Sequence, residues 1–315
     1  MKALSRESRP IVIASAFIAL ILLVGTVYTE VKFGGAPLLS PTYLLQQLQV
    51  GAFLGVVAAG MMVVILISQI DLSIPWTLTA AAMMATAVGG TWAVPVGLGV
   101  GLIVGLINGI GVAYLRVPSM IFTLGVNAVM RGLMVAQTGG YAPQTTSTDI
   151  MRYLAAGRTL GIPNALFVWL VVSLVTAMLL KRTTFGRYVY AIGNKEAAAY
   201  LAGVDTRLVT TACFAFCGLT SALAGILLTG YSTKAYQGMG DAYLLPAIAA
   251  VVIGGANILG GSGRYLGTLV GVALIVLLNS VLSIMDMPEA GRQIIYGGVI
   301  IGMLLVYGRG QRVAG

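Results

Sequence analysis

The sequence predicts an all-α integral membrane protein with about ten transmembrane helices. Of its 315 residues, 58% are hydrophobic and 9% are charged, and the mean hydropathy is +0.97. Soluble chains carry about 25% charged residues, so this chain lacks the polar surface that a water-soluble fold of its size needs. Its apolar runs are continuous and most are long enough to cross a bilayer as helices. A β-barrel would instead show short segments of alternating polarity.

Ten apolar runs mark the expected spans in chain order. They cover residues 11–28, 50–68, 76–89, 92–115, 118–136, 163–180, 208–230, 243–259, 265–284 and 294–307. The first run follows basic residues, as in a signal peptide, but no small-x-small cleavage site follows Tyr28. We therefore interpret it as an uncleaved first span.

The loop charges predict an orientation in which both termini are cytoplasmic. With the N-terminus inside, twelve basic residues fall in cytoplasmic segments: Lys2, Arg6, Arg9, Arg116, Lys181, Arg182, Arg187, Lys195, Arg207, Arg264, Arg309 and Arg312. Five fall outside: Lys32, Arg152, Arg158, Lys234 and Arg292. Cytoplasmic loops of membrane proteins are enriched in Lys and Arg. The same rule explains the net charge of +9 without a nucleic-acid partner.

Small residues in the spans predict close helix packing. Gly97, Gly101, Gly105 and Gly109 recur every four residues along the fourth span, so they form one helix face that another backbone can approach. A sliding surface is the alternative role for this face. Cys213 and Cys217 lie one turn apart in the seventh span, a spacing that favours packing over a disulfide.

An offset of about 171 residues indicates an internal repeat. It aligns Pro75 with Pro246 and Asn108 with Asn279, and it brings Asp71 within one residue of Asp241. Spans two to five then correspond to spans seven to ten. Because a shift of five spans is odd, the two halves are expected to have inverted topology, as in many transporters.

The stretch "LISQIDLSIPW", residues 66–76, places Asp71 and Pro75 before the short third span. The short eighth span follows Asp241 and Pro246 in the same way. Proline breaks helices, and interrupted spans in corresponding positions indicate a transport pathway. We expect Asp71 in a broken-helix element whose freed backbone groups are satisfied by Ser68, Gln69 and Ser73. A solvent-exposed interfacial loop is the alternative.

Four stretches carry a resemblance to a known family. They are "QIDLSIP" after the second span, "VPSMIFTLGVNAVMRGL" (117–133), "FGRYVYAIGNKEAAAYLAGVD" (185–205) and "AIAAVVIGGANILGGSGRYLGTLVG" (247–271). Together they resemble the permease subunit of bacterial ABC importers for monosaccharides, of the ribose, xylose, arabinose and galactose type. Pro75 and Trp76 depart from the small residues that the family has after D-L-S, and Leu245-Pro246 stands where many relatives carry an acidic residue.

The resemblance implies a single transmembrane permease domain, residues 1–315, that works with other proteins. The sequence contains no G-x-x-x-x-G-K-[ST] motif, so no cofactor is expected in this chain, and ATP and Mg would be bound by separate ABC ATPase subunits. The other implied partners are a periplasmic sugar-binding protein, received in part by the loop 137–162, a second permease copy or paralogue, and membrane lipid.

Residues 181–207 form the implied ATPase-coupling loop. Gly193, Asn194, Glu196 and Gly203 are its candidate residues. Asn194 is expected to cap a short helix, "KEAAAYLA", that ends at Gly203. A solvated basic loop is the alternative. The implied mechanism is alternating access, in which ATPase closure moves this loop.

The candidate substrate-pathway residues are polar side chains near the spans: Asp71, Ser73, Asn108, Asn127, Asn257 and Asn279. A neutral sugar needs scattered, weak hydroxyl and amide partners, since tight binding would prevent release. Each Asn could equally form an interhelical hydrogen bond. Arg131 is expected to pair or snorkel near the outer face rather than bind the sugar.

Two other function classes fit the sequence less well. An ion-coupled secondary transporter of a small polar solute usually carries acidic or His residues inside its spans, and this chain has no histidine. An intramembrane enzyme would need a metal, base or nucleophile motif, and neither H-E-x-x-H nor G-x-S-x-G occurs. The sequence does not distinguish which sugar is carried.

Overall fold

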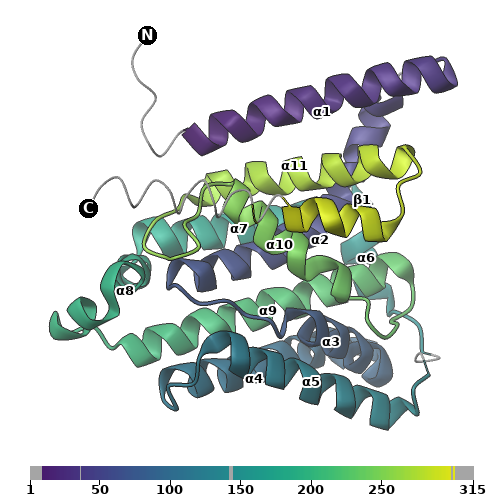
Figure 1. The fold of residues 1–315 in the computed structure, drawn as a ribbon. Coiled ribbons are helices and arrows are strands. Elements are labelled where there is room, and N and C mark those ends of the chain that lie inside the picture. Colours follow the sequence, from purple (N-terminus) through teal and green to yellow (C-terminus); the bar gives the residue numbers. More distant parts are fainter. Residues whose placement is uncertain (1–8, 36, 142–144, 299–300, 302–315) are drawn as a thin grey trace.

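The computed structural model describes residues 9–35, 37–141, 145–298 and 301 as a helical bundle (Figure 1). Its α-helices are α1 (Arg9–Phe33), α2 (Pro41–Leu66), α3 (Ile74–Val88), α4 (Ala93–Ala113), α5 (Ser119–Thr138), α6 (Asp149–Ala156), α7 (Asn164–Arg182), α8 (Thr184–Leu201), α9 (Thr206–Ser232), α10 (Leu244–Ile253) and α11 (Tyr265–Ile284). Short 3₁₀ turns are η1 (Pro37–Leu39), η2 (Gly90–Trp92) and η3 (Asp241–Tyr243).

Among the described residues, seven helices are long and apolar enough to cross a membrane: α1, α2, α4 with η2, α5, α7, α9 and α11. The prediction of a multi-span helical membrane protein is confirmed. The predicted third and eighth spans correspond to the shorter α3 and α10. Most of the predicted tenth span, 294–307, lies outside the described residues, although the chain is helical from 289 to 298.

The two ends of the bundle carry different elements. Figure 1 shows α8 at one end and α6 at the other, with α1 lying along α11 on the outer side of the bundle. Strands β1 (Arg158–Thr159) and β2 (Ile162–Pro163) form a two-residue antiparallel hairpin between α6 and α7. The helices α2 and α9 lie at the centre, and most of their residues are buried.

Local sequence sets the helix ends where they differ from the predictions. The helix α2 begins at Pro41, nine residues before the predicted start, because the Ser40 Oγ accepts a 3.2 Å hydrogen bond from the Tyr43 amide and Pro41 suits a first turn. The predicted span 243–259 is too long, since α10 ends at Ile253. Gly255 follows with a φ of 90°, which favours a turn.

The glycine face of α4 packs against α9. A Cβ atom on Gly101 would lie 2.3 Å from the Gly218 carbonyl oxygen, and one on Gly105 would lie 2.4 Å from the Phe214 carbonyl oxygen. Both distances are far below van der Waals contact, so larger residues would force the helices apart. The predicted close packing is confirmed. The two cysteines, Cys213 and Cys217, are buried free thiols on the same helix.

The predicted 27-residue loop 181–207 is mostly helical. The predicted start of its short helix is wrong. The helix α8 begins at Thr184, and the Thr183 Oγ1 accepts a 3.3 Å hydrogen bond from the Gly186 amide as its cap. A break at Lys195 (φ −162°, ψ 101°) divides α8 into two pieces, so Lys195 rather than Asn194 precedes the second piece. The predicted end is confirmed, because Gly203 has a φ of 85°.

Candidate functional site

The chain between α2 and α3 is an interrupted helix whose backbone is held by side chains of α5. The amide of Ile70 donates to Ser119 Oγ at 3.3 Å, and the amide of Leu72 donates to Thr123 Oγ1 at 2.9 Å. The amide of Trp76 donates to Asn127 Oδ1 at 3.2 Å. Because a buried amide without a partner costs about 1–3 kcal/mol, this polar stripe with a spacing of four residues stabilises the break.

Three predicted pathway residues meet in one buried cluster beside this break. Asp71 Oδ1 accepts from the Ser73 amide at 2.9 Å and from the Ser73 hydroxyl at 2.7 Å. The Asn108 amide group of α4 donates to Ser73 Oγ at 2.7 Å and to Asp71 Oδ1 at 3.3 Å. Asp71 is 1% exposed and Asn108 is 0% exposed. Asp71 therefore lies in the protein interior and not in a solvent-exposed loop.

Further groups enclose the Asp71 cluster. The Thr77 hydroxyl lies 3.2 Å from Ser73 Oγ, and the Cys217 thiol of α9 interacts with the Asp71 carboxyl group. The Asn108 Oδ1 atom is buried without a hydrogen-bond partner among the described residues. The cluster therefore links α3, α4 and α9 at the point where the second helix is interrupted.

A junction of close backbone contacts joins α8 to the interrupted helices. A Cβ atom on Gly193 would lie 1.8 Å from the Leu66 carbonyl oxygen and 2.4 Å from the Gly261 amide nitrogen. The Gly261 amide itself donates to the Leu66 carbonyl at 3.0 Å. Ser68, with a φ of 62°, donates to the Leu259 carbonyl at 2.6 Å. A displacement of α8 at Gly193 would thus act directly on the end of α2 and on the loop after α10.

A second connection to α8 is the ion pair between Glu196 and Arg116. The Arg116 Nη1 atom lies 2.7 Å from Glu196 Oε1, and both side chains are about half exposed. Glu196 also accepts from the Thr206 hydroxyl at 3.3 Å. Arg116 lies between α4 and α5 and has a φ of 58°, an uncommon conformation for a residue with a side chain. The pair lines a cavity of about 180 Å³, together with Gln69 and Thr210 among others.

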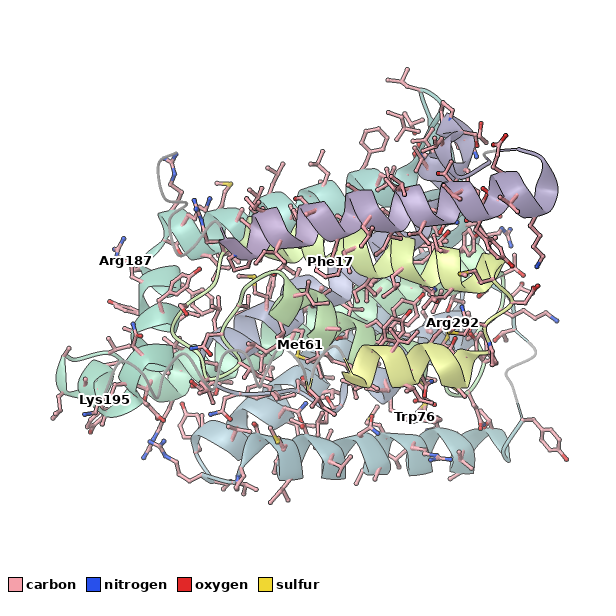
Figure 2. The ribbon with its side chains drawn as sticks, turned by 45° about the horizontal axis from the view of Figure 1, so that its top comes forward. Phe17, Met61, Trp76, Arg187, Lys195 and Arg292 are labelled. Atoms are coloured by element: carbon pink, nitrogen blue, oxygen red, sulfur yellow. The ribbon has the colours of Figure 1, made fainter. Side chains whose placement is uncertain are left out.

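The other predicted residues lie apart from the Asp71 cluster. The Asn257 Oδ1 accepts from the Leu259 amide at 3.1 Å in the loop after α10. The Asn279 Oδ1 accepts a 2.8 Å hydrogen bond from Arg292. Asn194 packs against Gly261, and Gly203 lies at the exposed end of α8. Figure 2 shows Arg187 and Lys195 projecting outward at the α8 end.

Sequence reasoning missed the residues that support these elements. Ser119 and Thr123 were not among the candidates, although their spacing from Asn127 on one helix could have indicated a polar face. Arg116 was counted only as a loop charge. Ser68 was expected to satisfy the freed groups of its own segment, but it donates to other segments. Its partners are more than 100 residues away in sequence, so no local pattern identifies them.

Comparison with known proteins identifies the family. The profile of the family described as "Branched-chain amino acid transport system / permease component" matches residues 43–304. The chain is 35% identical to the ribose import permease protein RbsC of Haemophilus influenzae, with 92% of this chain and 91% of that protein covered. It is 34% identical to RbsC of Escherichia coli, with 94% of both chains covered.

A second kind of relative is the autoinducer 2 import system permease protein LsrC of Salmonella choleraesuis, which is 34% identical over 80% of this chain and 74% of that protein. No solved structure matches the chain. The predicted resemblance to permease subunits of ABC sugar importers is confirmed, and the chain's role is that of a permease rather than an enzyme. The chain belongs to this family of transport-system permease components.

Proposed function

We propose that this chain is the single-domain membrane subunit of an ATP-driven importer that carries a neutral monosaccharide. The match over residues 43–304 and the two ribose import permeases support this proposal. ATP and Mg are bound by separate ATPase subunits, and a periplasmic binding protein delivers the sugar. Two copies of this chain, or this chain and a paralogue, form the pathway in a bacterial inner membrane.

The contact between α8 and the interrupted helices is the observation that carries the proposed mechanism. Gly193 on α8 touches both Leu66, at the end of α2, and Gly261, in the loop after α10. The ATPase subunits dock on α8, and their closure moves these two points together. Gly193 and Asn194 act at this junction, whereas Glu196 and Gly203 set the position of the second part of α8. Packed elements transmit such displacements because they are not continuously deformable.

The helices α2 to α5 and the helices from α9 to the C-terminal end form an inverted repeat. Its two halves move together when ATPase closure displaces α8. Shifted by 171 residues, α4 would cover 264–284, and α11 covers Tyr265–Ile284. The helix pairs are reciprocal: α4 packs on α9 and α11 packs on α2, while α3 contacts α9 and α10 contacts α2. This is the pairing expected of halves related by a two-fold axis in the membrane plane. With α8 and both termini cytoplasmic, α6 faces the periplasm.

The pathway residues divide into two groups in this proposal. Asp71, Ser73 and Asn108 are buried and hold the broken helix in place rather than bind the sugar. Asn127 lies on a partly exposed part of α5 and contacts the sugar. Asn257 and Asn279 line the two ends of the route. Weak, distributed contacts of this kind allow release.

The test is transport in proteoliposomes that contain the chain, its ATPase subunits and ATP, with the binding protein added outside. We expect uptake of radiolabelled ribose that requires ATP and persists when protonophores and sodium ionophores abolish ion gradients. The buried carboxylate of Asp71 favours one alternative, an ion-coupled secondary transporter of a small polar solute. Uptake by the chain alone that follows an ion gradient and ignores ATP would establish that alternative.

A further inference from the structure

Arg131 occupies an exposed position well inside the apolar helix α5. It precedes the helix end at Thr138 by seven residues, which places its Cα about 10 Å from that end at a rise of ~1.5 Å per residue. Its side chain is exposed. A charge at such a depth is costly when it faces lipid, and charged side chains inside spans face water-filled cavities or protein. This part of α5 therefore faces water or protein rather than lipid.

The Arg131 side chain is positioned by Trp76 rather than extended toward the helix end. The guanidinium carbon lies 5.9 Å from the centroid of the Trp76 ring, within the range of a cation–π interaction. Trp76 is 4% exposed, and its amide is bound by Asn127 Oδ1. Asn127 and Arg131 are one turn apart on α5, so they share a face. Trp76 thus holds Asn127 through its amide and contacts Arg131 through its ring.

A carboxylate completes this group from a distant part of the sequence. Asp241, on η3, has an exposed side chain and lies near enough to Arg131 for their opposite charges to attract. The turn η3 is held against the start of α3, because the Gly240 amide donates to Thr79 Oγ1 at 3.1 Å and a Cβ atom on Gly240 would lie 2.0 Å from the Pro75 carbonyl oxygen. Asp241 is therefore fixed relative to Trp76.

We propose that Asn127, Arg131 and Asp241 form a contact site for a neutral polyhydroxylated solute, with Trp76 as a positioning residue; the site rests on the proposed function. A carboxylate accepts hydrogen bonds from two hydroxyl groups, and a guanidinium donates to hydroxyl oxygens. The Asn127 Nδ2 group is not used in its bond to Trp76 and adds a donor. The charges of Arg131 and Asp241 cancel, so the site favours a neutral sugar over its anionic acid.

The direct test is titration of the purified chain with ribose and with ribonate, its anionic oxidation product, followed by Trp76 fluorescence. Trp92 and Trp169 are replaced by Phe so that only Trp76 reports. Asp241→Asn should weaken ribose binding about tenfold and bring ribonate affinity above ribose affinity. Arg131→Gln should weaken ribose binding by a similar factor without admitting ribonate. Lys234→Gln serves as the control, because it also removes one positive charge at the α6 end of the bundle but lies outside the site.

ATP-dependent uptake separates this inference from the proposed function. If the unmodified chain with its ATPase subunits takes up no sugar, the proposed function fails. If it does so, and Arg131→Gln and Asp241→Asn bind and transport ribose like Lys234→Gln, the site is refuted. It is also refuted if either variant changes only the oligomeric state on size exclusion, since that result would make Arg131 an interface residue. A switch toward ribonate in Asp241→Asn supports the site.

Discussion

Removing the ion pair between Arg116 and Glu196 should release the second part of α8 from the turn between α4 and α5. The oxygen and nitrogen atoms are 2.7 Å apart, and the side chains are 55% and 44% exposed. The gross attraction of two charges ~4 Å apart near a protein surface is about 4 kcal/mol. Hydration and side-chain entropy reduce the net value of exposed pairs to about 0.2–1 kcal/mol.

Two features place this pair at the upper end of that range. Glu196 also accepts a hydrogen bond from Thr206 at the start of α9, and Arg207 lies with its guanidinium carbon 5.6 Å from the Tyr114 ring centroid. The start of α9 therefore contacts both Glu196 on α8 and the end of α4, and so supports the ion pair from a third segment. We expect a coupling energy of about 0.5–1 kcal/mol, which corresponds to a two- to fivefold change in the fraction of molecules with α8 docked.

The assay is a double-mutant cycle of Glu196→Gln and Arg116→Gln, read by spin-label distances between positions 115 and 200. Leu115 and Tyr200 are exposed, and the native cysteines are buried, so introduced cysteines label selectively. The single variants should broaden the distance distribution, and the charge-swapped pair Glu196→Arg with Arg116→Glu should narrow it again. Glu30→Gln, an exposed site on α1, is the control. Strictly additive single effects would refute the coupling.

Three further changes test the junction and the break. Gly193→Ala should abolish ATP-driven uptake, because its Cβ would lie 1.8 Å from the Leu66 carbonyl oxygen; unchanged uptake would remove this contact from the mechanism. Gly203→Ala meets no atom within 4 Å but has a φ of 85°, so it should strain the end of α8 by about 1–2 kcal/mol and lower uptake per ATP; unchanged uptake per ATP would remove Gly203 from the coupling. Thr123→Val leaves the Leu72 amide without its acceptor and should lower the free energy of unfolding by about 1–3 kcal/mol. Denaturation in detergent measures this loss. A loss no larger than that of an exposed Thr→Val variant would contradict the role assigned to Thr123.

The candidate site was only partly accessible from sequence. The proline and acid of residues 71–75 indicated an interrupted helix, and the glycine spacing of α4 indicated close packing. Asp71, Ser73 and Asn108 were grouped as pathway residues, and the structure brings them together in a buried cluster. Asn257 and Asn279 were placed in the same group because they are amides near spans, but composition does not tell which amides meet.

The membrane location, the helical class, most of the spans and the family could all be predicted from the sequence, because each of these depends on composition, local periodicity or short motifs. The folded structure alone reveals that α5 supplies acceptors to the broken helix, that Gly193 touches Leu66 and Gly261, and that Arg131 contacts the Trp76 ring near Asp241. These contacts join residues that lie about 50 positions or more apart in sequence, and in one case 125 positions apart. The packing of whole helices fixes them, and no local pattern encodes that packing.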